Sequence, residues 1–318
     1  MKSKLLSVVV IGGVGIVALS GCAKDNKAEF FKYNQELTKS TYQKYDMDLK
    51  KVEVKADGQY QMYAPMINGY LNDFKISGDM STDGKNKAVT TNVKLLGQNF
   101  PLEFLTKGDI PYLKLDTIGP ILNFYLNMAS QSTGKAPQTV DTSNLKDKYV
   151  DLLAIAEENN KQAADIKTVK SEESQKAVEK TLKSMDKANF KKDGSAITLT
   201  LSGKEFAKLV QTYLDELPKS SQESVKSATK DENIEAEIAK VIKSTTITLD
   251  NKKKTSNTKI NFTGDKANGI GLSGYVTYDV SYENKKVKVS LPKDENIIKS
   301  SNELSSLFSK LMPTGITQ

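Results

Sequence analysis

The sequence predicts an α+β fold: a curved, antiparallel β-meander sheet in two similar halves, covered by amphipathic helices. Period-two alternation of polar and apolar residues gathers in two separate regions, about residues 45–115 and 190–291. Stretches with helical spacing are set apart from the strands, at the ends of these regions or, as at 203–217, between strands, and Asp-Gly pairs mark turns between the strands. Strands grouped apart from helices favour α+β over a parallel α/β sheet. Two separate domains are the alternative to one sheet built from two halves.

The first half begins with a helix and continues as a meander. An apolar stripe predicts a helix over residues 28–42, and from Tyr45 the period changes to two. A change of phase at Lys50-Lys51 suggests a β-bulge, and residues 59–64 are expected to form a further strand. Turn residues such as Asp83-Gly84 then separate the remaining strands of this half, at 71–80, 88–95, 100–106 and 110–115.

Residues 118–129 are the most apolar stretch after the N-terminal segment, and Pro120 suits the first turn of a helix there. Because this helix is apolar on nearly all sides, it is expected to be buried against the sheet. The alternative is that it borders the mouth of a lipid-binding cavity. A polar loop over residues 130–144 follows it.

The second half carries the clearest amphipathic helix. Phe206, Leu209, Val210, Tyr213 and Leu214 recur at helical spacing after Ser202 or Gly203, and Pro218 ends the run. Expected strands surround this helix, and Glu283-Asn284-Lys285 is expected to be the tightest hairpin turn; the strands lie at 197–201, 245–249, 259–262, 272–282 and 286–291. A last helix is expected near residues 296–311.

The N-terminal segment has the order of an export signal. Lys2 and Lys4 precede an uncharged apolar run, which ends in Leu19-Ser20-Gly21-Cys22. This ending resembles a bacterial lipobox, and Cys22 is the single cysteine of the chain. The resemblance implies cleavage between Gly21 and Cys22 and diacylglyceryl modification of the Cys22 sulfur. An ordinary secretory signal with a chance cysteine is the alternative.

These segments predict four regions and a location. Residues 1–21 are the signal peptide, 22–29 a lipid-anchored tether, 30–130 the first half and 131–318 the second half. The expected location is the outer face of the bacterial cytoplasmic membrane, with the lipid on Cys22 as the membrane attachment.

Composition argues against most catalytic chemistry. The chain has no His and no Trp, and all 46 basic residues are Lys. Without His or a free thiol, the usual general base, thiol nucleophile and metal ligands are missing, so we expect no enzyme, cofactor or metal site. A glycosidase that uses carboxylates alone remains formally possible. The absence of Arg removes the bidentate fork typical of nucleic-acid recognition, so no nucleic-acid partner is expected.

Aromatic residues supply the candidate ligand-binding positions. Several tyrosines in or beside strands, together with the apolar stretch 118–129, suggest a groove for a sugar or an amphiphile. Because tyrosine is also an ordinary strand residue, a structural role is the alternative. The candidate positions are Ile121, Phe124, Tyr125, Tyr275 and Tyr278.

The succession of export signal, helix, meander and covering helices resembles the LolA/LppX-like group of lipoproteins. Residues 145–152 (LKDKYVDL) are similar to a phrase met in such lipoproteins of Gram-positive bacteria. The resemblance implies a half-open sheet closed by helices around an apolar cavity for acyl chains. It implies no particular ligand residues.

The expected function is therefore a membrane-anchored, non-catalytic lipoprotein that binds a lipid or another amphiphile. The alternative is a cell-surface interaction protein that contacts wall polymer, another envelope protein or a phage component. The two differ in the interior that they require, since the first needs a cavity and the second a packed core with an exposed binding patch.

Overall fold

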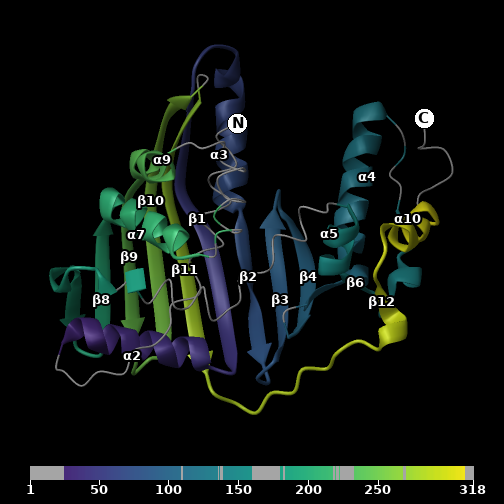
Figure 1. Cartoon of the computed structure of the whole chain (residues 1–318). Coiled ribbons are helices and arrows are strands. Elements are labelled where there is room, and N and C mark those ends of the chain that lie inside the picture. Colours follow the sequence, from purple (N-terminus) through teal and green to yellow (C-terminus); the bar gives the residue numbers. More distant parts are fainter. Residues whose placement is uncertain are drawn as a thin grey trace. The chain divides into compact units, whose positions relative to one another are not determined.

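The computed structural model describes residues 25–108, 110–134, 136, 139–159, 180–181, 183–217, 219, 222, 233–267 and 270–311. It is mixed α+β with mostly antiparallel strands, as the sequence predicts, and the described residues form twelve strands (Figure 1). Two compact units divide the chain. Unit 1 combines residues Met1–Lys75 with Asp165–Lys285, and unit 2 combines Ile76–Ala164 with Lys286–Gln318. The predicted signal peptide, with Gly21 and Cys22, lies outside the described residues.

The strands of unit 1 form one antiparallel sheet. Their order is β1, β11, β10, β9, β8 and β7. Their bounds are Tyr42–Ala56 (β1), Phe190–Asp193 (β7), Ala196–Ser202 (β8), Ile242–Asp250 (β9), Thr255–Ala267 (β10) and Ile270–Glu283 (β11).

A β-bulge interrupts β1 where the sequence predicts one. The register with β11 shifts between Lys50 and Glu53, and Lys51 has a φ of 50°. Gly274 lies opposite on β11, with a φ of 156°, and a Cβ there would come 3.1 Å from the Cα of Val52. The bulge therefore needs a glycine on the facing strand.

The register divides the side chains of this sheet between two faces. One row runs Leu199, Ile247, Thr258, Tyr278 and Met47 across β8, β9, β10, β11 and β1, on what we call the apolar face. The neighbouring row, on the polar face, runs Thr198, Thr248, Asn257, Asp279 and Asp46. This alternation is what a sheet with one face against a core requires.

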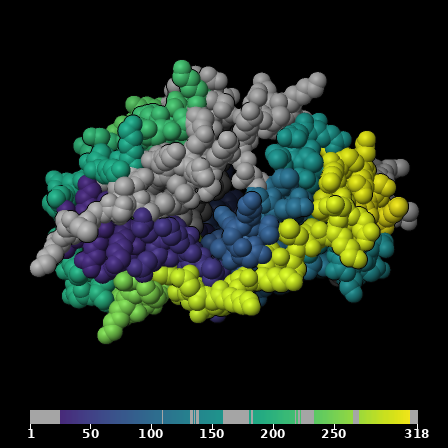
Figure 2. Space-filling model, turned by 60° about the horizontal axis from the view of Figure 1, so that its bottom comes forward, coloured from purple at the N-terminus to yellow at the C-terminus, as the bar shows by residue number. Residues whose placement is uncertain are grey.

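Helices of unit 1 pack on the apolar face. Their bounds are Asn26–Lys39 (α2), Ala64–Asp73 (α3), Gly203–Asp215 (α7) and Ile234–Val241 (α9). Phe30 and Phe31 of α2 meet Phe190 edge to face and pack with Ile197, Leu199 and Leu249. A second cluster joins α3, α7 and α9 to β1, β10 and β11. The space-filling view shows the purple N-terminal segment, which includes α2, at the surface (Figure 2).

Unit 2 repeats the combination of strands and helices. Its strand order is β12, β6, β5, β4, β3 and β2, and only the β12–β6 pair described here is parallel. The strands are Lys75–Thr82 (β2), Asn86–Leu95 (β3), Gln98–Lys107 (β4), Ile110–Lys114 (β5), Tyr149–Asp151 (β6) and Ile297–Ile298 (β12). The helices are Gly119–Thr133 (α4), Leu152–Asn159 (α5) and Ser301–Ser309 (α10). One core cluster joins α4, α5 and α10 around Leu115, Leu145 and Ile298.

Two predicted strands are absent from the structure. Residues 59–64 form instead a 3₁₀ turn, η2 (Gly58–Tyr63), which leads into α3. Residues 286–291 pair with no strand, so the predicted hairpin at 283–285 is wrong. The alternation in this segment nevertheless reflects burial, because Val289 packs with Leu105 and Tyr112.

The division into units differs from the predicted halves, because each unit combines an early and a late part of the chain. The predicted boundary between residues 130 and 131 falls inside α4, which belongs to unit 2. The predicted tether 22–29 overlaps α2, whose first residue, Asn26, follows the N-cap Asp25.

Candidate functional site

The predicted ligand residues of α4 point in different directions. Phe124 packs edge to face on Phe100, with ring centroids 5.3 Å apart, and Leu126 is buried. Ile121 and Tyr125, one turn apart, are 38% and 66% exposed. The expected burial of this helix against the sheet therefore holds for one side only: Phe124 packs on β4, while the other side of α4 keeps an exposed apolar stripe.

The two predicted tyrosines of β11 lie on opposite faces of the unit 1 sheet. Tyr278 is on the apolar face beside Tyr45, and burial raises the pKa of its hydroxyl to about 12. Tyr275 is on the polar face, where the Nζ of Lys259 lies 4.2 Å from its ring centroid. The five predicted residues are thus divided between the units, and the two tyrosines of unit 1 do not share a site.

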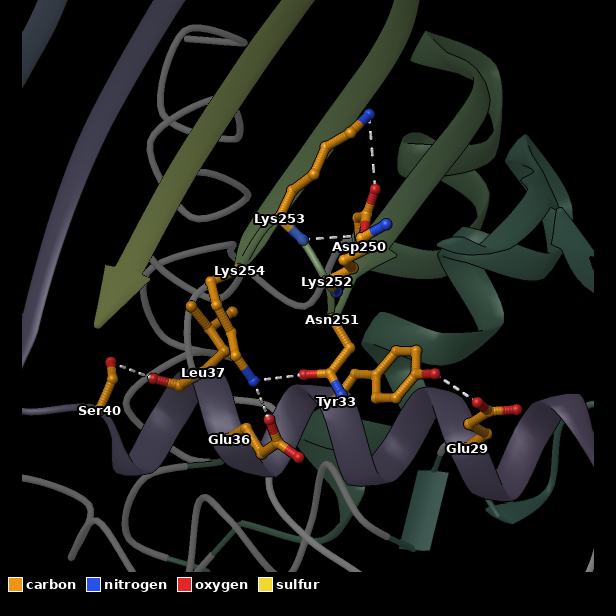
Figure 3. A network of polar contacts seen from close by, with 10 residues as sticks. All are labelled: Glu29, Tyr33, Glu36, Leu37, Ser40, Asp250, Asn251, Lys252, Lys253 and Lys254. Carbon is orange, nitrogen blue, oxygen red and sulfur yellow. Dashed lines mark hydrogen bonds and ion pairs between the residues drawn. The ribbon is translucent and has the colours of Figure 1, made fainter. Parts of the chain in front are cut away.

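A polar network fixes α2 to the sheet of unit 1. Lys192 of β7 places its Nζ 2.7 and 2.6 Å from the two carboxylate oxygens of Glu29, which also accepts a hydrogen bond from the Tyr33 hydroxyl. Two turns after Glu29, Lys254 reaches Glu36 at 2.6 Å and the Asn251 side chain at 2.6 Å. Figure 3 shows the Tyr33–Glu29 hydrogen bond within α2 and the contacts of Lys254, in the turn after β9, with Glu36 and Asn251.

The first turn of α2 is held separately. Lys187 pairs with Asp25 at 2.6 Å, and the Lys27 Nζ donates to the carbonyls of Lys183 and Met185 at 2.7 and 2.6 Å. Desolvation at this site lowers the pKa of Lys27. The sequence leaves only Ala23 and Lys24 between Cys22 and Asp25, so a lipid on Cys22 would be attached almost directly to a fixed element.

Glu29 makes the attachment of α2 sensitive to acid. The hydrogen bond from Lys192, reinforced by that from Tyr33, holds the Glu29 pKa below its ordinary value of 4.5. A depressed folded-state pKa stabilises the fold above pH 4.5, and this stabilisation is lost as the pH falls through the folded-state value. The free energy of unfolding, measured with urea, should fall between pH 6 and pH 3. We expect this fall to be smaller in Glu29→Gln than in the unchanged protein.

Lys192→Met provides the matched test, because it removes the partner and keeps the carboxylate. Lys192→Met should also reduce the fall in unfolding free energy between pH 6 and pH 3. The double variant should show nearly the same fall as either single variant, because both changes remove one interaction. Equal acid dependence in all four proteins would contradict a stabilising role for this pair.

Unit 1 contains a cavity of about 380 Å³ beside α7, which we call the α7 cavity. Apolar side chains and polar side chains both line it. The lining residues are Thr181, Ser184, Met185, Asp186, Asn189, Leu201, Glu205, Lys208, Leu209 and Thr212. Its volume is within the range of small-ligand pockets.

The polar rim of the α7 cavity is ordered by the start of α7. Glu205 accepts from the backbone N–H and the hydroxyl of Ser202, both at 2.7 Å, and from Asn189 at 2.9 Å. These hydrogen bonds, chiefly those from Ser202, lower the Glu205 pKa, so the carboxylate stays ionised beside Lys208. Sequence reasoning found α7 but missed the cavity, because its walls also come from residues 181–189.

The described residues contain no group of three His, Cys, Asp or Glu side chains that could hold a metal ion. None of the helices that the structure describes combines the length and apolar character needed to cross a bilayer. The chain matches no protein-family model, and none of the curated proteins is similar to it in sequence.

Proposed function

We propose that this chain is an exported, non-catalytic lipoprotein, anchored through Cys22 to the outer face of the cytoplasmic membrane, that binds an amphiphile. The observation that carries the proposal is the α7 cavity. Met185, Leu201 and Leu209 offer an apolar surface, while Glu205 and Lys208 bring opposite charges to the same cavity. An apolar cavity with a few ordered polar groups suits a molecule with an acyl chain and a polar head.

The finer architecture belongs to the same proposal. We infer that the units are two similar halves, each a sheet with amphipathic helices over one face, in the manner of the LolA/LppX-like group. Six strands in each unit support this idea, as do the helix-to-sheet core clusters within each unit.

Native mass spectrometry of the purified protein tests amphiphile binding. We expect a non-covalent adduct that organic solvent extracts, and we expect Leu209→Trp to lower its occupancy, because the larger ring fills part of the α7 cavity. Lys204→Trp is the matched control, since Lys204 is an exposed residue of α7 that does not line the cavity. Protein that carries no adduct, or equal occupancy in both variants, would contradict this use of the cavity.

Membrane anchoring has its own test. Cys22→Ser removes the sulfur that accepts the lipid, so the protein should move from the membrane fraction to the soluble fraction of the producing cells. Ser20→Ala keeps a small residue before Gly21-Cys22 and should leave the protein with the membrane. Unchanged membrane association of Cys22→Ser would show that the sulfur is not the attachment.

The polar face of unit 1 favours a second candidate, a surface interaction protein that contacts wall polymer. Thr, Ser and Asn side chains are frequent on this face, alongside charged residues such as Asp46 and Asp279. The Thr198 and Thr248 hydroxyls are 2.9 Å apart, and Asn261 donates to Ser244 at 2.8 Å. Such an array offers hydroxyl and amide groups to a polyhydroxylated polymer. Co-sedimentation with purified cell walls should then fall in Asn257→Ala and stay unchanged in Leu209→Trp.

A further inference from the structure

A segment at one end of β1 exposes apolar side chains without any charge among them. Residues 58–72 (GQYQMYAPMINGYLN) contain no Asp, Glu or Lys, in a chain that is 27% charged. Most of the exposed large apolar residues of unit 1 lie here, and Met62 is 75% exposed. We call these residues the η2–α3 patch: Tyr60, Met62, Tyr63, Met66 and Tyr70.

The opposite side of α3 holds the patch in place. Ala64, Ile67 and Leu71 pack into the core cluster that contains Val52 and Val54. Two asparagines of α3 also satisfy the backbone of β1. The Asn68 side chain accepts from the Val54 N–H at 2.6 Å, and Asn72 accepts from the Val52 N–H and donates to the Val52 carbonyl, both at 2.9 Å. The exposed side chains therefore stand on a fixed helix.

The chemistry of the patch matches the interfacial layer of a bilayer. Tyrosine presents an apolar ring and a hydroxyl, and is enriched where hydrocarbon meets headgroups. Methionine is apolar and adapts to irregular surroundings. Burial of this surface in an interface leaves no charge of residues 58–72 to desolvate.

The position of the patch on unit 1 agrees with this partner. Both α2 and α3 pack on the apolar face of the unit 1 sheet. The strand register shows this, because the sheet residues in contact with each helix belong to rows on that face. If Cys22 is lipidated, as the proposed function has it, the two residues between Cys22 and Asp25 keep the start of α2 close to the bilayer. The side of unit 1 that carries both helices then faces the lipid.

We propose that the η2–α3 patch inserts its tyrosine and methionine side chains into the interfacial layer of the membrane, as a second contact beside the lipid anchor. This part of the proposal rests on the proposed function only for the nearness of the membrane. A single acylated residue leaves a protein free to rotate about its tether, and a second, apolar contact would fix one side of unit 1 against the bilayer.

The absence of Trp from the chain gives a direct experiment. Residues 22–318 with Cys22→Ser, which lack both signal peptide and lipid, receive one tryptophan by Met62→Trp. We expect a blue shift of its fluorescence on mixing with phosphatidylglycerol–phosphatidylcholine vesicles, and quenching by brominated acyl chains. Thr200→Trp in the same background is the control, because Thr200 is exposed on the polar face, and its emission should not change.

A charge in the patch should weaken the contact. Met62→Asp is expected to lower the partition constant of the protein onto vesicles about tenfold, because one large apolar side chain is lost from the interface. Unshifted Met62→Trp emission, or an equal shift at Thr200→Trp, would overturn the proposal and leave a protein partner for the patch. Since this experiment contains no lipid anchor, its failure is distinguishable from a failure of Cys22→Ser to release the full chain.

Discussion

Gly203→Ala is expected to lower the free energy of unfolding by about 3 kcal/mol or more. Gly203 is the first residue of α7, and a Cβ there would lie 1.9 Å from the carbonyl oxygen of Ile242, an impossible contact. The obstacle is backbone on β9, which no side-chain rotation relieves. α7 would have to move away from the sheet, and Ala207 and Leu214 would lose their buried contacts.

Urea unfolding followed by circular dichroism measures this loss, and Gly69→Ala is the matched control. Gly69 lies in α3, and a Cβ there would have no atom within 4 Å. Since alanine is the better helix former, Gly69→Ala should raise stability by about 0.5–1 kcal/mol. Similar stability of Gly203→Ala and the unchanged protein would show that the close approach of α7 to β9 is not needed for the fold.

Elements with local signals were predictable from the sequence. The start of α7 follows from Ser202 and Glu205, which form a reciprocal capping box, and its extent follows from apolar residues at helical spacing. The bulge of β1 was visible as a change of phase at Lys50-Lys51. In each case the sequence pattern and the structure depend on residues a few positions apart.

Elements that depend on distant partners were mispredicted. Residues 59–64 alternate like a strand, yet they form η2 and the start of α3, whose asparagines bond to β1. Residues 286–291 alternate because one side is buried, without a neighbouring strand. The interleaving of the two units likewise rests on pairings such as β1 with β11, more than two hundred residues apart.

The candidate site was less predictable than the fold. That Tyr275 and Tyr278 face opposite sides follows from their odd spacing in one strand, and this signal was available in the sequence. The α7 cavity was not predictable, because residues 181–189 and α7 meet only in the folded chain. The exposed patch was not predictable for the same reason: which residues of an uncharged run are exposed depends on which side of α3 packs into the core.

Phe30→Ala is expected to cost about 3–5 kcal/mol, because it removes a fully buried aromatic ring from the contact between α2 and the sheet. The ring centroid lies 5.3 Å from that of Phe190, edge to face, within the core cluster that joins α2 to the sheet. Tyr63→Ala, at an exposed ring of the same unit, is the control and should change stability by less than about 0.5 kcal/mol.

The loss in Phe30→Ala should concentrate in α2. Without the ring, α2 depends more on its polar contacts, such as the ion pairs of Glu29 and Glu36, and pairs at the surface contribute little. We therefore expect trypsin to cut Phe30→Ala after Lys32 and Lys39 under conditions that leave the unchanged protein intact. Resistance equal to that of Tyr63→Ala would mean that polar contacts suffice. Faster cleavage would mean that aromatic packing makes α2 a fixed element immediately after Cys22.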